Sequence, residues 1–395
     1  MEILFLAHRI PFPPDRGDKI RSFHMLRYLC GLAKVHLACF ADDEADAAHL
    51  AGLREALGPA LGEAHVEVRR TSRAAAGLRA LLERKPVSLT MFDSGAMRGF
   101  VSRILARPEV ATAFAFSGQM AQFVPAGTRL IMDFVDMDSA KFEAYAAEGG
   151  PLAAVHRREA KKLFAFERET AARAAASLFV SEAEAALFRS RTGLAAMAVN
   201  NGVDLGFYDP AGSWPTVDAP RPLVVFTGQM DYAPNVDAVR WFAAEVLPRL
   251  DDATFAIVGR NPAPEVQRLA GPRILVTGAV PDVRPWLAAA GVVAAPLRIA
   301  RGVQNKVLEA MAMARPVVAS PAAFEGIEAE PGRDLLVADG AEAQAAAIAG
   351  LLAHPARARA LGEAGRARVE TAYRWDACLA PLAGLIGASE QRAAA

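Results

Sequence analysis

The chain has 395 residues, 53% of them hydrophobic, so it is long enough for two domains with large buried cores. Its 44 lysines and arginines balance its 44 aspartates and glutamates, which excludes a global positive field of the kind that attracts nucleic acid. Three widely separated cysteines, Cys30, Cys39 and Cys378, lack metal-type spacing and are typical of reduced thiols in a cytoplasmic protein.

The first half alternates short apolar runs with helical patterns. The N-terminal run, EILFLAH, is followed by charged residues and predicts a first strand and not a signal peptide. The predicted strands are 2–8, 34–40, 65–70, 112–117, 129–136 and 177–181, and the predicted helices include 18–32, 45–57 and 139–176. This alternation indicates a parallel, doubly wound sheet.

A proline-rich segment without periodicity, 209–222, predicts a linker between domains 1–208 and 223–372. Beyond it the alternation resumes, with predicted strands at 223–228, 254–259, 273–280, 291–297, 316–320 and 334–339. The sequence therefore predicts an α/β protein with two Rossmann-like domains and a ligand site in the cleft between them. Residues 373–395 are expected to form a C-terminal helix that returns toward the first domain.

The segment RGVQNKVLEAMAMARPVVAS, 301–320, gathers charges at the start of a predicted helix. A carboxylate at Glu309 can accept two hydrogen bonds from a ribose diol, while free N–H groups near 303–305 can bind an anion. Arg301 and Lys306 add positive charge for phosphates. A nucleotide diphosphate meets both demands, and the alternative is an ordinary charged helix start exposed to water.

Several segments carry a resemblance: LVVFTGQMDYAPNVDAVRWF, TFAIVGRNP, DVRPWLAAAGVVAAPL, NKVLEAMAMARPVVAS and NNGVD. Together they resemble the retaining glycosyltransferases of the GT-B fold, family 4, over essentially the whole chain. PFPPDRGDKIRSFHML and MDFVDMDSAKFEAY further resemble the branch associated with PEP-CTERM/exosortase exopolysaccharide systems.

The resemblance implies metal-independent transfer of a sugar, with retention, from a nucleotide diphosphate sugar to a glycan or polyprenyl-linked acceptor, without a further cofactor. It implies that the second domain binds the donor and the first binds the acceptor. Glu309 matches the family glutamate that holds the ribose. The other donor-binding positions that it implies in the second domain are Gly228, Gln229, Gly259, Arg260, Val280, Arg298, Gln304 and Asn305.

The chain departs from the family at its phosphate-binding positions. Arg301 stands where the family has a first glutamate, and Gln229 and Asn235 stand where it has an Arg and a Lys. We hypothesise that Arg301 and Lys306, with Arg298 and Arg260, neutralise the departing diphosphate instead. The alternative is that Arg301 pairs with the carboxylate of an acidic donor sugar.

The first domain offers two further candidates. Gly17 and Asp18 match a Gly-Gly pair at the first helix. Gly17 either lets the backbone approach the donor or is a plain helix-start turn, and Asp18 contacts a sugar hydroxyl or caps the helix. The expected histidine after strand 129–136 is absent, and Asp136 is our candidate for its role. Asp136 and Asp138 also form a D-x-D, a metal motif that the doubly wound layout argues against. His8 and His24 are expected on the same side, as core or helix-face residues more readily than as catalysts.

The predicted helix around 151–168 is basic on one arc, with Arg157, Arg158, Lys161, Lys162 and Arg168, and apolar on the other. It could lie against anionic lipid at the inner face of the plasma membrane, which suits a lipid-linked acceptor, or be a water-exposed face over a core stripe. Two other functions stay open: a nucleotide-sugar 2-epimerase and a degenerate GT-B protein that binds without turnover. A dinucleotide oxidoreductase is disfavoured because no G-x-G-x-x-G follows a strand.

Overall fold

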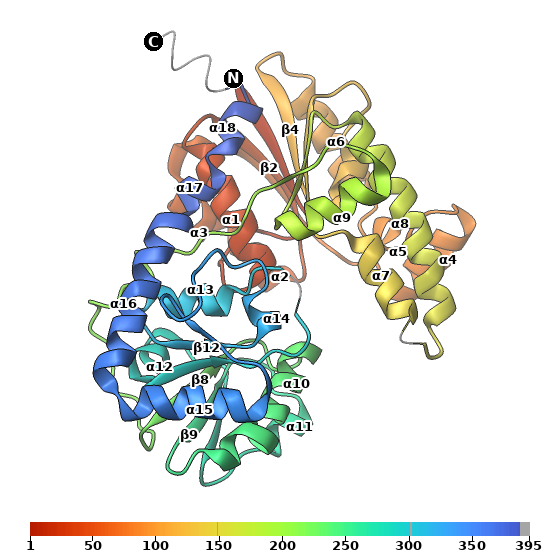
Figure 1. Ribbon diagram of the computed structural model, residues 1–395. Coiled ribbons are helices and arrows are strands. Elements are labelled where there is room, and N and C mark those ends of the chain that lie inside the picture. The colour runs from red at the N-terminus through yellow and green to blue at the C-terminus, as the bar shows by residue number, and fades with distance from the viewer. Residues whose placement is uncertain (148, 301, 388–395) are drawn as a thin grey trace. The chain divides into compact units, whose positions relative to one another are not determined.

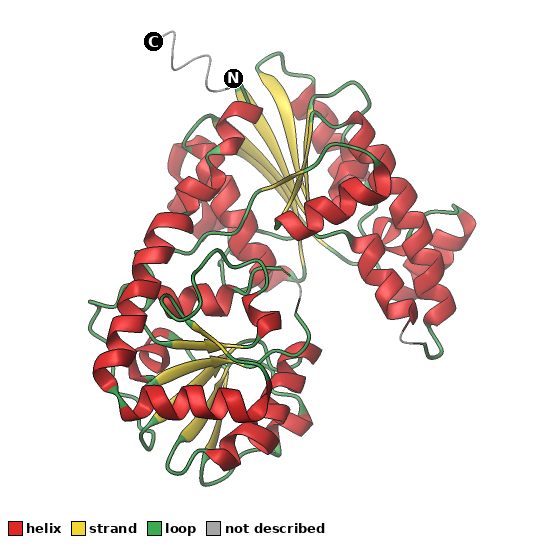
Figure 2. Cartoon of the chain, in the orientation of Figure 1, coloured by secondary structure: helices red, strands yellow, loops and turns green. Residues whose placement is uncertain are grey.

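The computed structural model describes residues 1–147, 149–300 and 302–387. These residues divide into two compact units. The N-terminal unit comprises Met1–Asn200 and the segment that begins at Leu379, and the C-terminal unit comprises Asn201–Cys378. Each unit contains one sheet flanked by helices (Figures 1 and 2).

The N-terminal unit is built on a seven-stranded parallel sheet of order β3-β2-β1-β4-β5-β6-β7. The strands β1 and β4 are apolar and buried over nearly their whole length, as expected of a sheet covered on both faces. The strands are β1 (Glu2–Ala7), β2 (Lys34–Ala41), β3 (Leu61–Val68), β4 (Val110–Phe116), β5 (Leu130–Val135), β6 (Ala176–Phe179) and β7 (Met197–Ala198). The helices are α1 (Gly17–Cys30), α2 (Glu44–Ala48), α3 (Leu50–Leu57), α4 (Arg73–Leu82), α5 (Val87–Met91), α6 (Gly95–Leu105), α7 (Asp138–Ala147), α8 (Ala153–Arg173), α9 (Glu182–Thr192) and α18 (Pro381–Leu385).

The C-terminal unit repeats this design with a six-stranded parallel sheet of order β10-β9-β8-β11-β12-β13. Its strands are β8 (Leu223–Thr227), β9 (Thr254–Val258), β10 (Ile274–Gly278), β11 (Val292–Ala295), β12 (Val317–Ala319) and β13 (Leu336–Val337). Its helices are α10 (Ala233–Trp241), α11 (Pro264–Gln267), α12 (Arg284–Ala289), α13 (Asn305–Ala312), α14 (Pro321–Phe324), α15 (Gly340–Ala353) and α16 (Pro355–Ala372), and α17 (Trp375–Leu379) ends where the chain re-enters the N-terminal unit. The predicted α/β class with two doubly wound sheets is confirmed.

Three predicted elements differ from the structure. The predicted helix 139–176 is two helices, α7 and α8, because Gly149 and Gly150 adopt left-handed backbone angles (φ 81° and 88°) and Pro151 follows. The predicted helix 45–57 is likewise divided at His49, which caps both α2 and α3. Of the strand predicted at 334–339, Leu336–Val337 forms β13 and Leu335 makes an isolated bridge with Pro331.

Candidate functional site

The strand order of the C-terminal unit reverses between β8 and β11. In open α/β sheets the carboxyl ends of the strands at such a switch point form the ligand crevice. Gly228 directly follows β8, Arg298 lies three residues after β11, and α13 begins soon afterwards at Asn305. The topology therefore brings the predicted donor-binding segments to one edge of this sheet.

The loops after β8 and β9 touch through their backbones. Gly228 and Gly259 have φ values of 157° and 154°, which side-chain-bearing residues rarely adopt. A Cβ atom added at Gly259 would lie 1.6 Å from the carbonyl oxygen of Gly228. Only glycine fits at residue 259, and the closeness of the two loops depends on it.

Lys306, in the first turn of α13, points back to the loop after β8. Its Nζ donates to Oδ1 of Asn235 at 2.5 Å and lies 4.4 Å from the ring centre of Phe226. Burial lowers the pKa of Lys306 to about 7, and the negative charge of Glu309 opposes this shift only in part. Asn235 lies in the first turn of α10, and its amide donates to the backbone oxygen of Gln229 at 2.9 Å, so Lys306 is linked through Asn235 to the loop after β8.

Glu309 lies one turn further along α13 and accepts a hydrogen bond from the hydroxyl of Tyr208. Burial raises the pKa of Glu309, while the bond from Tyr208 and the charge of Lys306 act in the opposite direction. Tyr208 is a site residue that sequence reasoning missed. It lies at the end of the first predicted domain, where no motif or periodicity distinguishes it.

Three other predicted donor-binding residues, Arg298, Gln304 and Asn305, contact neighbours within the C-terminal unit. Arg298 forms an ion pair with Asp237, with Nε 2.9 Å from Oδ2, so its charge is already balanced by a neighbour. Gln304 donates to the backbone oxygen of Gly302 at 3.1 Å. Asn305 accepts from Asn201 at 3.4 Å.

Three predicted residues remain. Arg260 accepts from the backbone N–H of Met230 at 2.9 Å through its own backbone oxygen. Val280 packs against the core of the C-terminal unit. Arg301, our candidate for the leaving-group charge, lies outside the described residues.

In the N-terminal unit the strand order reverses between β1 and β4, and His8 follows β1 at this point. Its ring stacks on Phe116, the last residue of β4, with centroids 5.9 Å apart. Nε2 of His8 lies 3.3 Å from Oδ2 of Asp18. Nδ1 is buried and has no hydrogen-bond partner among the described residues.

Asp18 lies inside the first turn of α1, which begins at Gly17, and does not cap the helix as one expectation had it. The capping position is Arg16, which forms no side-chain cap bond, because a guanidinium has no acceptor to offer the backbone N–H groups. The carboxylate of Asp18 is turned toward cations instead. It accepts from Arg9 Nη1 at 2.8 Å and from Arg16 Nε at 2.7 Å. Burial alone raises the pKa of Asp18, but the bonds from His8 and Arg16 outweigh it and hold the pKa well below its usual range.

Asp136 is presented by a strained turn after β5. Val135 has φ 71°, an unusual value for a β-branched residue, and its N–H donates to Oδ1 of Asp133 at 3.0 Å. Asp133 is fully buried and paired with Arg21, whose Nε lies 2.9 Å from Oδ2. Asp136 itself is exposed, yet desolvation by its surroundings and the negative charge of Glu184 raise the pKa of its carboxyl to about 6.

The backbone after Asp136 is held by two glutamates. Glu184 accepts from the N–H of Met137 at 2.8 Å, and Glu167 accepts from the N–H of Ser139 at 2.9 Å. Asp138 is the first residue of α7, and burial raises its pKa. Within the described ranges, no group of three His, Cys, Asp or Glu side chains is arranged to hold a metal ion.

The basic helix predicted around 151–168 is α8. Leu163 is buried, whereas Leu152 and Val155 are exposed beside the cations. Arg158 is turned toward backbone oxygens of Ala80 and Lys85. In the part of the chain that the structure describes, no helix is both long enough and apolar enough to cross a membrane.

Comparison with protein families gives one match, to the family described as "Glycosyl transferases group 1", over residues 221–354. This segment contains Gly228, Gly259, Lys306 and Glu309. No curated protein matches the sequence significantly.

Comparison with solved structures shows the fold over the full length. Sucrose-phosphate synthase from Thermosynechococcus elongatus is 18% identical, with complete coverage of both chains and a TM-score of 0.70. WaaG, a glycosyltransferase involved in lipopolysaccharide biosynthesis, is 14% identical, with 98% of this chain and 100% of WaaG covered and a TM-score of 0.68. Alr3699/HepE from Anabaena, in complex with UDP-glucose, is 16% identical, with 98% and 99% covered and a TM-score of 0.62. The fold is therefore GT-B-like, and the match to group 1 glycosyl transferases lies within the C-terminal unit.

Proposed function

We propose that this protein is a retaining, metal-independent glycosyltransferase of the family 4 type. It moves a sugar from a nucleotide diphosphate sugar to a glycan or polyprenyl-linked acceptor in cell-surface polysaccharide synthesis. The C-terminal unit binds the donor, and the N-terminal unit contributes groups toward the acceptor. The proposal on the donor draws support from Alr3699/HepE, a structural neighbour that binds UDP-glucose. The proposed role in cell-surface polysaccharide synthesis draws support from WaaG, which is involved in lipopolysaccharide biosynthesis.

The observation that carries the proposal is the pair Lys306 and Glu309 at the start of α13, beside the glycine-only contact of Gly228 and Gly259. The two glycines let the loops after β8 and β9 pack against each other beside the ammonium group of Lys306. A diphosphate can then meet the N–H groups at the start of α13. Glu309 supplies the carboxylate for a ribose diol, and Lys306 supplies positive charge one turn away.

The leaving-group chemistry follows from this arrangement. As the bond between sugar and diphosphate breaks, negative charge develops on the phosphate oxygens. Removing one preorganised donor to such a charge typically costs about 3 kcal/mol of transition-state stabilisation. We assign this role to Lys306, with Arg301 as its partner. Arg298 has a smaller share because Asp237 balances its charge. The departing phosphate oxygen accepts the proton of the attacking acceptor hydroxyl.

In the N-terminal unit, Asp136 and the cluster of Asp18 and His8 are the groups that we assign to sugar hydroxyls. All three follow strands of the sheet at or near its switch point. The Asp18 carboxylate is held by Arg9 and Arg16, so it is a fixed acceptor of hydrogen bonds.

The test is a thermal-shift panel of UDP, GDP and ADP in a chelator, on the wild type, Glu309→Gln and Glu363→Gln. Glu363 is an exposed glutamate of α16 in the same unit and serves as the matched control. We expect one nucleoside diphosphate to stabilise the wild type and the control but not Glu309→Gln. No stabilisation by any of them would overturn the donor assignment.

Turnover and stereochemistry need separate measurements. Hydrolysis of the matching nucleotide sugar without acceptor distinguishes an enzyme from a protein that only binds, because a binding protein releases no sugar. The proton NMR coupling of the anomeric centre in an early product then reports its configuration. A product with inverted configuration contradicts the retaining mechanism.

A further inference from the structure

The leucines Leu78, Leu81 and Leu82 of helix α4 face water and not the core. Ala76 and Ala80 are its fully buried residues, and they lie one turn apart on the inner face. Leu78, Leu81 and Leu82 lie on the opposite arc and are between 62% and 77% exposed. Three exposed leucines on one helix face leave a large apolar area in water, and such areas mark interaction sites.

Helix α8 reaches the end of α4 through Arg158, and two more exposed apolar residues lie at its start. Arg158 Nη2 donates to the backbone oxygens of Ala80 at 2.7 Å and Lys85 at 3.2 Å. Glu159 accepts from the N–H groups of residues 87 and 88, at the start of α5, at 2.8 and 2.9 Å. Val155, 50% exposed, lies one turn before Arg158 on the same side of α8, and Leu152, 59% exposed, precedes it. We call Leu78, Leu81, Leu82, Leu152 and Val155 the apolar patch.

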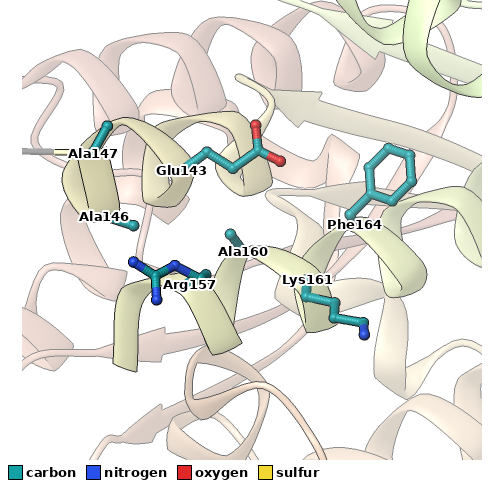
Figure 3. Close-up of a pocket in the computed structure, with 7 residues that line it drawn as sticks. All are labelled: Glu143, Ala146, Ala147, Arg157, Ala160, Lys161 and Phe164. Atoms are coloured by element: carbon teal, nitrogen blue, oxygen red, sulfur yellow. The ribbon is translucent and has the colours of Figure 1, made fainter. Parts of the chain in front are cut away.

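Three cations belong to the elements that carry the apolar patch: Arg84 follows α4, and Arg157 and Lys161 lie on α8. Arg84, Arg157 and Lys161 are exposed, and their side chains have no ion-pair partner among the described residues. Arg157, Lys161 and Phe164 of α8 line an open pocket of about 470 Å³. Residues of α7 line its other side (Figure 3). Glu143 of α7 also lines this pocket, but its charge is matched by an ion pair with Arg191.

We propose that the apolar patch and its cations dock this protein on an anionic lipid bilayer. The leucines of α4 enter the boundary between headgroups and acyl chains, with the helix axis in the plane of the membrane. Arg84, Arg157 and Lys161 then lie among the headgroups, and the pocket between α7 and α8 accepts one phosphate-bearing headgroup. The exposed leucines match the apolar acyl layer of a bilayer, and the cations match its anionic headgroup layer.

This inference deepens the proposed function, because an enzyme that uses a polyprenyl-linked acceptor must work at a bilayer surface. It extends the partner from an acceptor molecule to the membrane that holds the acceptor. Its test requires no glycosyl transfer, so docking and catalysis can fail separately.

The experiment is flotation of the full chain with two kinds of vesicle, phosphatidylcholine alone and phosphatidylcholine mixed with phosphatidylglycerol. We expect the chain to float with the mixed vesicles and to stay largely free with the neutral ones. The triple variant Leu78→Ser, Leu81→Ser, Leu82→Ser should lower the partition coefficient more than about tenfold. Ile299→Ser, which removes an exposed apolar side chain from the C-terminal unit, should leave it unchanged.

Charge reversal tests the cations. Arg157→Glu with Lys161→Glu should weaken binding to mixed vesicles by at least about fivefold for each cation removed. The matched control, Arg357→Glu with Arg359→Glu, makes the same change of net charge at exposed positions of α16 and should bind as the wild type does. Because all these positions are exposed, the melting temperature of each variant should stay close to that of the wild type.

Three results overturn the proposal. The first is failure to float with either vesicle, and the second is equal flotation with both. The third is a concentration-dependent dimer in sedimentation analysis that the triple leucine variant abolishes, since a second copy of the chain would then cover the patch. If flotation fails while a nucleoside diphosphate still stabilises the chain, docking is wrong and the proposed function stands.

Discussion

Lys306 gives the sharpest prediction about the donor site. Burial lowers the pKa of its ammonium group to about 7, so a large part of the population is uncharged just above neutrality. A diphosphate binds the charged form. A nucleoside diphosphate sugar should therefore bind about tenfold more weakly at about pH 8 than at about pH 6, where nearly all Lys306 is protonated.

The assay is isothermal titration calorimetry across this pH range in two buffers of different ionisation enthalpy. The sugar-linked diphosphate has no terminal phosphate proton to lose in this range, so changes in its own charge do not contribute. We expect proton uptake on binding, rising toward one proton for each ligand at the alkaline end. The charge-free variant Lys306→Met should bind weakly, with no pH dependence and no proton uptake.

Affinity of the wild type that stays constant from about pH 6 to about pH 8 would refute this reasoning, because it would mean that Lys306 keeps its proton or does not meet the phosphates. Proton uptake that persists in Lys306→Met would assign the titration to another group. Asn235 is the partner to change next, since Asn235→Leu removes the side-chain oxygen in the first turn of α10 that accepts from the Lys306 ammonium, and it should lower the pKa of Lys306 further.

Three further predictions concern stability, measured by urea-induced unfolding. Gly259→Ala should lower the free energy of unfolding by about 3 kcal/mol, because the added methyl group would overlap the backbone of the loop after β8. The control Gly350→Ala places its methyl group in open space on α15 and should raise the free energy of unfolding by about 0.5–1 kcal/mol. Arg21→Met should cost about 3–5 kcal/mol by leaving Asp133 buried and unpaired, and adding Asp133→Leu should recover part of that loss. Burial raises the pKa of Glu167 from 4.5 to about 7, so the folded state binds this proton more tightly than the unfolded state does. The free energy of unfolding should therefore fall as the pH rises from 4.5 to about 7. Glu167→Gln should remove that pH dependence, and an unchanged dependence in the variant would contradict the assignment.

The fold could be predicted from sequence because parallel strands covered on both faces are continuous apolar runs. The run LVVFT is an example, and it forms β8, Leu223–Thr227. Errors arose where local backbone geometry overrides helical periodicity. Gly149 and Gly150 end one helix and allow another to begin, although the residues on both sides share a helical pattern.

Part of the candidate site could be predicted from local sequence, and part could not. The position of Lys306 and Glu309 at a helix start follows from local sequence, and the structure does place both in α13. Their partners do not follow, because Asn235 is 71 residues from Lys306, and Asp237 is 61 residues from Arg298. Such pairs depend on how loops from different strands meet at a sheet edge, which periodicity and spacing do not encode.

The N-terminal unit is discontinuous, and this affects how the protein is made. Its last helix, α18, comes from the end of the chain, where the backbone oxygen of Leu385 accepts from Arg129 at 2.9 Å. During translation the first 200 residues emerge early, but this contact forms only after the entire C-terminal unit has left the ribosome. During translation the nascent N-terminal unit therefore exposes the surface that α18 later covers. A fragment that ends at Asn200 would expose that surface permanently.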